Sequence, residues 1–298
     1  MALKTRLAPS PTGSLHLGNA RTFLVNWALA RQRGWRVVMR IEDLDGPRVK
    51  PEAAEGILRT LEWLGVDWDE GPYVQSDDLA PYRAALDRLI AAGAVFPCAL
   101  TRGELTAASA PHGHEVRYSP ELRPASWERR FADGVNWRLR VDPGAVPFND
   151  MFHGPQAPDL SGVVGDFIVW TKRGVPAYQL AVVVDDHRQG VTHVVRGDDL
   201  LDSAARQLLL FRALDLKPEP EYCHLPLVVG PDGMRLAKRH GDSRLEKWRA
   251  EGVRPEKIVG TLARWCGVAA AGDLSAAEFK SAFALENVPR QPVVFTGL

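Results

Sequence analysis

Hydrophobic and polar residues in the N-terminal part of the chain follow the two periods that strands and helices produce. Residues 4–8 and 36–41 are short runs rich in β-forming side chains and predict strands. Residues 17–33 have apolar positions at helical spacing and predict a helix between them. Further helices are predicted over 51–64, where a proline suits the first turn, and over 79–92. This alternation is typical of a doubly wound α/β fold with a parallel sheet.

The alternation stops at residue 101, and up to residue 162 proline and glycine interrupt every apolar stretch, which predicts an inserted subdomain. Beyond it, strands are predicted at 163–169, 178–184, 191–196 and 225–229, and helices at 202–214, 255–266 and 275–284. We therefore expect four parts. They are the first half of a catalytic domain (1–98), an inserted acceptor-binding-like subdomain (99–162), the second half (163–230), and a loop with a small helical region (231–298).

Composition places the chain among ordinary globular proteins. Its 298 residues are 45% hydrophobic and 25% charged, which excludes a disordered or fibrous chain. No apolar run approaches the roughly 18 to 20 residues of a membrane helix, and the first residues lack the pattern of a secretory signal. Cys98, Cys223 and Cys266 are widely separated, so we expect no disulfides and a cytoplasmic location.

Net charge does not identify a partner, because 37 basic residues balance 37 acidic ones. A local basic surface is sufficient to bind nucleic acid, and two groups of basic residues are dense enough to be considered. They are Arg235, Lys238, Arg239, Arg244, Lys247 and Arg249, and Arg117, Arg123, Arg129 and Arg130. Solvated surface is the more ordinary interpretation of both groups.

The first segment with candidate chemistry is residues 8–19, APSPTGSLHLGN, which joins the first strand to the first helix. Open α/β sheets bind ligands at this place, and a helix N-terminus presents N–H groups to phosphate. His16 and Asn19 could donate to phosphate oxygens, and Gly18 permits close approach of a nucleotide. Taken alone, the tetrapeptide from His16 to Asn19 also fits a structural turn. No Gly-Lys pair occurs, so the chain has no Walker A loop.

The second segment is residues 235–239, RLAKR, which follows a Gly-Pro-Asp-Gly turn. A glycine-flanked loop that carries a cation suits charge stabilisation during phosphoryl chemistry. On its own it would be interpreted as a basic surface loop.

Five segments in this order resemble those of the class I aminoacyl-tRNA synthetases, and within them the glutamyl branch. They are residues 6–19, 40–45 (RIEDLD), 178–186, 193–201 and 235–239, of which the first resembles the HIGH region and the last the KMSKS loop. The resemblance implies a Rossmann-like catalytic domain with an inserted subdomain and a small helical C-terminal region that contacts the tRNA stem. It also implies ATP, with Mg²⁺, as the activating substrate.

Only 59 residues follow Arg239, too few for the large helical anticodon-binding part of a full glutamyl synthetase. The resemblance is therefore closer to shortened members, which activate L-glutamate and esterify it to queuosine at the wobble position of tRNA(Asp). We expect those partners, no membrane association, and a monomer. A truncated synthetase that charges ordinary tRNA ends, and a silent paralogue that only binds glutamate, nucleotide or tRNA, remain alternatives.

The resemblance also assigns the site. It implies a glutamate pocket made of Arg6, Leu7, Ala8, Pro9, Ser10, Glu42, Tyr178 and Arg196. Guanidinium groups pair with carboxylates in a bidentate way, so Arg6 and Arg196 suit the substrate carboxylates and Glu42 its ammonium. The Tyr178 hydroxyl suits the side-chain carboxylate.

Three further residues, His16, Asn19 and Lys238, would stabilise charge on the ATP α-phosphate, and ATP would contact them and Gly18. Asn19 stands where the family has the last histidine of HIGH, and Arg235 and Ala237 replace the first lysine and the serine of KMSKS. The roles of Asp185, Asp186, Asp198 and Asp199 stay open between orienting the arginines and binding ribose.

The largest departure concerns zinc. Many relatives carry a Cys-x-Cys pair, then a tyrosine and a third cysteine in the insertion. Here Leu100 follows Cys98 at the second position, and Leu122 stands at the third position after Tyr118. Structural zinc needs about four ligands, usually Cys or His, so we expect no structural zinc. The remaining alternative is that His112 and His114 complete a site with Cys98.

Overall fold

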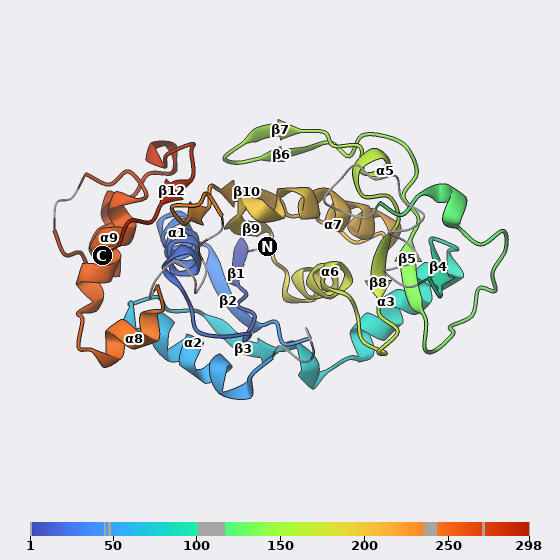
Figure 1. Cartoon of the computed structure of the whole chain (residues 1–298), viewed down its shortest axis with the longest axis horizontal. Helices are drawn as coiled ribbons and strands as arrows, with labels where there is room; N and C mark the ends of the chain where they lie inside the picture. The colour runs from blue at the N-terminus through green and yellow to red at the C-terminus, as the bar shows by residue number, and fades with distance from the viewer. Residues whose placement is uncertain are drawn as a thin grey trace.

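Two parallel sheets meet in the middle of the computed structural model, which describes residues 2–44, 46, 49–100, 117–234, 236, 243–269 and 272–297 (Figure 1). The first sheet has the order β1 (Lys4–Leu7), β2 (Arg36–Ile41), β3 (Glu70–Val74). The second has the order β7 (Gly154–Gln156), β6 (Phe148–Asp150), β10 (Glu221–Leu225), β9 (His193–Gly197), in which only β7 is antiparallel to its neighbour.

The two sheets join along a seam between β1 and β9. The Thr192 backbone N–H donates to the Lys4 carbonyl at 2.9 Å, and the Arg6 side chain reaches the Val195 carbonyl at 3.5 Å. Residue numbers rise in both strands along this contact, so β1 and β9 run in the same direction. From β1 the chain builds outward on one side to β2 and β3, and on the other side are β9 and β10. Ligands of doubly wound proteins bind at the carboxyl ends of the strands beside such a reversal of strand order.

Helices on one side of the sheets enclose a first hydrophobic core. It contains Leu24 of α1, Val37 and Met39 of β2, and Ile258 and Phe279 of the C-terminal helices. The helices are α1 (Leu17–Arg33), α2 (Pro51–Trp63), α8 (Leu245–Ala250), α9 (Pro255–Arg264) and α10 (Ala276–Ala282). A two-stranded parallel sheet, β11 (Val228–Val229) with β12 (Val293–Val294), ties the C-terminal segment to them.

A second core lies on the other side and includes Leu86, Trp137, Leu180, Val183 and Phe211. It is enclosed by α3 (Ala80–Ala91), α5 (Leu160–Val163), α6 (Tyr178–Gln189) and α7 (Leu201–Ala213), and by the antiparallel sheet β4 (Val95–Cys98), β5 (Asn136–Leu139), β8 (Phe167–Trp170). Short 3₁₀ turns are formed by Gln75–Asp77, Pro120–Leu122, Asp198–Leu200 and Leu285–Asn287. The antiparallel sheet takes strands from both sides of residues 99–162, and the four-part division of the chain stays a prediction.

Most predicted elements are confirmed, but one is of the wrong type. Residues 178–184 were predicted as a strand, whereas they begin the helix α6. Three consecutive valines raise strand propensity, yet helix α6 is buried from Gln179 to Asp186, so its sequence shows no polar face. The strand predicted at 163–169 begins only at Phe167, and 225–229 contains the end of β10 and all of β11.

None of the helices in the described part of the chain is both long and apolar enough to cross a membrane.

Candidate active site

Predicted site residues gather at the carboxyl ends of the parallel strands. Arg6 lies in β1, Glu42 directly follows β2, and Arg196 lies in β9, and all three are buried. The Glu42 N–H donates to the Pro9 carbonyl at 3.0 Å, which holds the turn after β1 against the end of β2. In this turn Leu7 and Pro9 are buried, Ala8 is half-buried and Ser10 is exposed. The seam thus brings Arg6 and Glu42 from one sheet next to Arg196 from the other.

An ion-pair network fixes the first arginine and the glutamate. Arg40 reaches Glu42 Oε1 at 3.0 Å and Asp186 Oδ1 at 2.8 Å, and Arg6 Nε lies 3.5 Å from the same Asp186 oxygen. Burial raises the pKa of Glu42, and the Arg40 and Arg6 cations oppose that rise. Burial lowers the pKa of Arg6, against the attraction of Asp186. The network therefore keeps cations and carboxylates together in a desolvated place.

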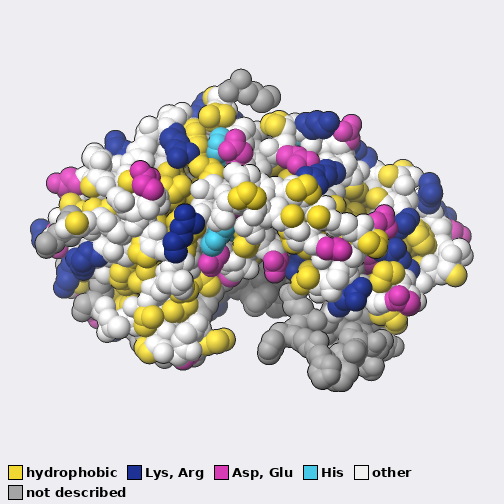
Figure 2. Space-filling view, turned by 90° about the horizontal axis from the view of Figure 1, so that it is seen from above, with side chains coloured by type: hydrophobic (Ala, Val, Ile, Leu, Met, Phe, Trp, Pro, Cys, Tyr) yellow, Lys and Arg dark blue, Asp and Glu magenta, His cyan; other side chains and the backbone are white. Residues whose placement is uncertain are grey.

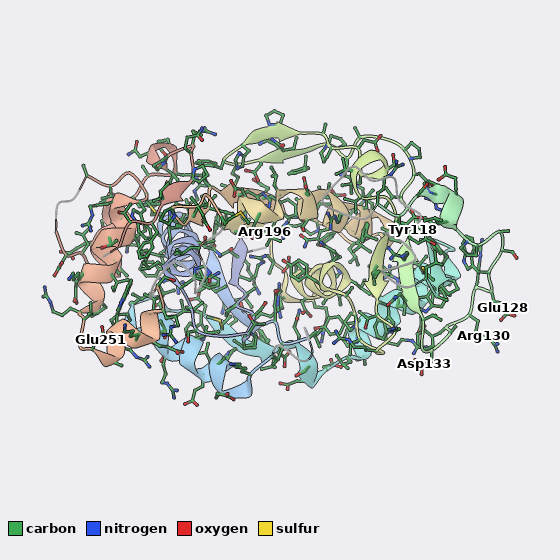
Figure 3. All side chains as sticks on the ribbon, viewed as in Figure 1. Tyr118, Glu128, Arg130, Asp133, Arg196 and Glu251 are labelled. Atoms are coloured by element: carbon green, nitrogen blue, oxygen red, sulfur yellow. The ribbon has the colours of Figure 1, made fainter. Side chains whose placement is uncertain are left out.

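Neutral groups, in contrast, hold Arg196. Its Nε donates to His224 Nε2 at 2.9 Å, its Nη1 to Gln207 Oε1 at 2.9 Å, and its Nη2 to the Leu200 carbonyl at 3.2 Å. Figure 3 shows Arg196 near the middle of the molecule, far from the labelled surface residues of the insertion.

Tyr178 completes this group at the first turn of α6. It is 41% exposed, and it interacts electrostatically with Glu42, Arg196 and Arg6. Desolvation, followed by the Glu42 carboxylate, raises the pKa of its hydroxyl, so Tyr178 stays a neutral donor. The structure therefore brings together the four predicted side chains Arg6, Glu42, Tyr178 and Arg196.

His16 begins α1 as its N-cap, and its Nδ1 accepts the Asn19 N–H at 3.4 Å. A Cβ on Gly18 would lie 3.1 Å from the His16 ring, so the ring rests against the glycine backbone. The loop before α1 is bound to the start of α8, because the Leu245 N–H donates to the Leu15 carbonyl at 3.0 Å. Within the predicted KMSKS-like loop, the Leu236 N–H donates to the Val228 carbonyl at 3.0 Å.

Lys238, Arg235, Ala237 and Arg239 lie outside the described residues, and so do His112 and His114. Leu236 within the predicted loop and Ser243 after it are nevertheless attached near the start of α1. Val228, to which Leu236 bonds, is 3.5 Å from the Cβ position of Gly18, and Ser243 accepts the Leu17 N–H at 3.2 Å.

Several residues at the site had no role in the sequence analysis. Arg40 could have been found, because it lies two residues before Glu42 in a strand and therefore on the same face. Asp186 was left open between two roles. His224, Gln207 and Asp150 gave no signal, since their partners are distant in sequence: His224 Nδ1 lies 2.6 Å from Asp150 Oδ2.

The zinc-site positions of the relatives form an apolar cluster here. Cys98, Phe96 and Tyr118 are buried together, with Leu100 and Leu122 packed against them, and the Tyr118 hydroxyl donates to the Leu122 carbonyl at 2.7 Å. Within the described residues, no group of three or more His, Cys, Asp or Glu side chains is placed to hold a metal. The described donor set does not fit zinc, and the absence of zinc stays a prediction.

The second basic group has counter-charges or carbonyl partners. Arg123 pairs with Asp166 at 2.6 Å, Arg130 with Glu128 at 3.4 Å, and Arg129 reaches the Ala91 carbonyl. On the face in Figure 2, Lys and Arg side chains are interleaved with Asp and Glu. Arg129 and Arg130 are exposed, whereas Arg123 is half-buried and supports the interior through Asp166.

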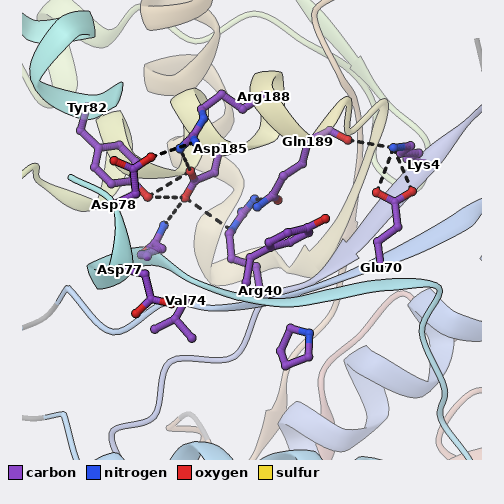
Figure 4. Close-up of a pocket in the computed structure, with 13 residues that line it drawn as sticks. Lys4, Arg40, Glu70, Val74, Asp77, Asp78, Tyr82, Asp185, Arg188 and Gln189 are labelled. Carbon is purple, nitrogen blue, oxygen red and sulfur yellow. Dashed lines mark hydrogen bonds and ion pairs between the residues drawn. The ribbon is translucent and has the colours of Figure 1, made fainter. Parts of the chain in front are cut away.

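A separate pocket of about 390 Å³ lies behind the network, between β3, α3 and α6 (Figure 4). Its charges pair within its own wall: Lys4 with Glu70 at 3.0 Å, and Arg188 with Asp78 at 3.2 Å. Arg40 lines this pocket and also contacts Glu42, so the Arg40 side chain separates the pocket from the candidate site.

A family described as "tRNA synthetases class I (E and Q), catalytic domain" matches residues 2–295. The chain belongs to this family. The glutamyl-Q tRNA(Asp) synthetase of Symbiobacterium thermophilum is 47% identical over 97% of this chain and 94% of its own length. The glutamate–tRNA ligase of Heliobacterium modesticaldum is 38% identical over 98% of this chain and 62% of its own length. The crystal structure of the glutamate-tRNA synthetase from Elizabethkingia anophelis superposes with a TM-score of 0.84 and 26% identity, covering 100% of this chain and 68% of that one.

Membership of this class I family implies use of ATP, and the α/β fold with parallel sheets agrees with it. The site residues themselves are assigned by position and chemistry alone.

Proposed function

We propose that this protein is an enzyme that activates L-glutamate with ATP and transfers it to queuosine at the wobble position of tRNA(Asp). The observation that carries the proposal is the 47% identity to a glutamyl-Q tRNA(Asp) synthetase along 97% of this chain and 94% of that relative. The arrangement of charges at the carboxyl ends of β1, β2 and β9 supports glutamate as the amino acid.

In the proposed complex, glutamate lies across the seam. Arg196 binds the side-chain carboxylate, with the neutral Tyr178 hydroxyl as a second donor. Arg6 and the backbone of residues 7–10 bind the main-chain end, and Glu42 binds the ammonium group. Two arginines against one acid match a substrate with two carboxylates and one ammonium.

Activation requires little covalent participation by the protein. A carboxylate oxygen of glutamate attacks the α-phosphorus, the bond to the bridging oxygen breaks, and pyrophosphate leaves with the electron pair. His16, Asn19 and Lys238 stabilise the charge on the α-phosphate, and Gly18 allows the nucleotide to approach the start of α1. Mg²⁺ on the phosphates supplies further charge neutralisation. A hydroxyl of the queuosine cyclopentene diol then attacks the glutamyl carbonyl carbon, and AMP leaves.

The test is transfer of labelled glutamate with ATP onto two tRNA pools, one from cells that make queuosine and one from cells that cannot. Label confined to the queuosine-containing pool supports the proposal. Equal label on both pools would indicate a synthetase that charges ordinary tRNA 3′ ends. Label on neither pool, together with no glutamate-dependent exchange of pyrophosphate into ATP, would indicate a silent paralogue that only binds ligands.

A further inference from the structure

The arginines at the site differ in the charge of their partners. Arg6 and Arg40 both lie against the carboxylate of Asp186, at 3.5 and 2.8 Å. Among the residues that the structure describes, Arg196 donates to neutral acceptors: an imidazole nitrogen, an amide oxygen and a carbonyl oxygen. A guanidinium carries five N–H donors, and these three bonds leave two of them for a ligand. The positive charge of Arg196 is therefore not cancelled by direct contact with a carboxylate.

One of these acceptors must be held in a single tautomer. His224 Nε2 can accept from Arg196 Nε only if its proton is on Nδ1. Asp150 Oδ2 lies 2.6 Å from Nδ1 and is the acceptor for that proton. Asp150 is itself oriented by the turn after β6, because its Oδ1 accepts the N–H groups of Phe152 and His153 at 3.0 and 2.9 Å. His224 and Asp150 are both almost completely buried.

We propose that Asp150 and His224 are positioning residues that hold the Arg196 guanidinium toward the side-chain carboxylate of glutamate without neutralising it. This inference rests on the proposed function and deepens it, because the uncompensated charge is what distinguishes glutamate from its uncharged amide, glutamine. A carboxylate in direct contact with Arg196 would hold the side chain equally well, but it would weaken the field that selects an anion. Because the Asp150 carboxylate acts through the His224 ring, it orients Arg196 without touching it. The positive charge of Arg196 is then left to attract the substrate carboxylate.

Asp150→Asn tests the tautomer with little change in shape. Oδ1 can still accept the two N–H groups of the turn, whereas the amide NH₂ now faces His224 Nδ1. That donor favours the tautomer with its proton on Nε2, where it meets the Arg196 Nε–H. Because two N–H donors then face each other, the Arg196 side chain must turn away from His224. The substitution itself removes no side-chain atom position, since asparagine and aspartate have the same shape.

The experiment measures glutamate-dependent exchange of pyrophosphate into ATP for the full chain and its variants. For Asp150→Asn we expect the KM for glutamate to rise roughly 10- to 100-fold, as for loss of one charge-assisted contact, while the KM for ATP stays within about twofold. The inhibition constant of glutamine, a competitor without the carboxylate, should also change little. Unchanged glutamate KM in a folded Asp150→Asn variant would overturn the inference.

Asp166→Asn is the matched control. Asp166 is as buried as Asp150 and also supports an arginine, but it lies directly before β8 of the antiparallel sheet. Both variants lose a buried carboxylate, so both should lower the melting temperature. Only Asp150→Asn should change the selectivity for glutamate over glutamine. Equal loss of selectivity in both variants would assign the effect to stability and contradict the inference.

A second pair of variants keeps the test open if Asp150→Asn folds poorly. His224→Gln retains an oxygen that can accept from Arg196, whereas His224→Leu is similar in size and has no acceptor. The glutamate KM should rise about tenfold more in the Leu variant than in the Gln variant. Equal values would overturn the positioning role. If the wild-type protein itself showed no glutamate-dependent exchange, the proposed function would fail first, and the inference with it.

Discussion

Glu42 lies in surroundings that disfavour a charged carboxyl group. Burial raises its pKa, and only the cations of Arg40 and Arg6 oppose that effect. The substrate ammonium is the partner that we propose for this buried carboxyl group.

Replacing this charge should therefore affect binding more than folding. For Glu42→Gln we expect the KM for glutamate in pyrophosphate exchange to rise about 10- to 100-fold, since a charged hydrogen bond is lost. The melting temperature should change little, because the desolvated charge is removed together with its attraction to Arg40. Glu219→Gln, which breaks an ion pair with Arg212 that is partly exposed, is the control and should leave the KM unchanged. An unaltered KM in Glu42→Gln would remove Glu42 from the glutamate pocket.

His224 should also determine part of the pH dependence of stability. Burial lowers the pKa of His224 to about 4 from 6.5, and Arg196 and His153 act in the same direction against Asp150. The unfolded chain therefore binds one more proton between these values, so stability is complete above pH 6.5 and falls as the pH drops toward 4. The expected loss is about 3 kcal/mol.

Chemical denaturation at several pH values checks this expectation, with His224→Gln as the comparison. Buried His193 remains in both proteins, so the difference between their curves isolates His224. Parallel curves for wild type and variant between pH 6.5 and 4 would contradict the assignment.

At the scale of elements, the start of α1 depends on a glycine for its geometry. Gly18→Ala would place a methyl group 3.1 Å from the His16 ring, and the ring must move. We expect kcat for pyrophosphate exchange to fall roughly 10- to 100-fold, because small displacements of a group that stabilises the transition state are costly. Gly162→Ala, where the new methyl group meets no atom within 4 Å, should retain wild-type kcat. Equal rates in both variants would show that His16 is not part of the phosphate site.

The sequence predicts elements well where one face is polar. Helix α2 has apolar residues on one face, and it was predicted to within one residue. Helix α6 failed because Val182, Val183 and Val184 are all buried, so no amphipathic period distinguishes a helix from a buried strand. That Arg6, Glu42, Tyr178 and Arg196 lie close together could be predicted because they lie in motifs that resemble a family, and their role in binding glutamate stays a prediction. Asp150 and His224 could not, since their pairing joins β6 to β10 and exists only after the sheet forms.

For the whole molecule, the apolar cluster around Cys98 predicts independence from zinc. Leu100 and Leu122 stand at the positions where the family resemblance implies zinc ligands, and they pack against Phe96 and Tyr118. Metal analysis of protein purified without chelator should find less than stoichiometric zinc, and EDTA should leave the melting temperature unchanged. One tightly bound zinc per chain, lost on mutation of Cys98, would contradict this expectation and would implicate His112 and His114.

The seam between β1 and β9 gives glutamate a mechanical role as well as a chemical one. The proposed pocket takes Arg6 and Glu42 from the β1 side of the seam and Arg196 and Tyr178 from the other side. Bound glutamate would act as a clasp across this joint, so backbone amides of β1 and β9 should exchange with deuterium more slowly in its presence. Unaltered exchange in both strands under saturating glutamate would contradict this. Glutamate binding would then reduce backbone motion on both sides of the seam, out to the C-terminal helices at one end of the molecule and the antiparallel sheet at the other (Figure 1).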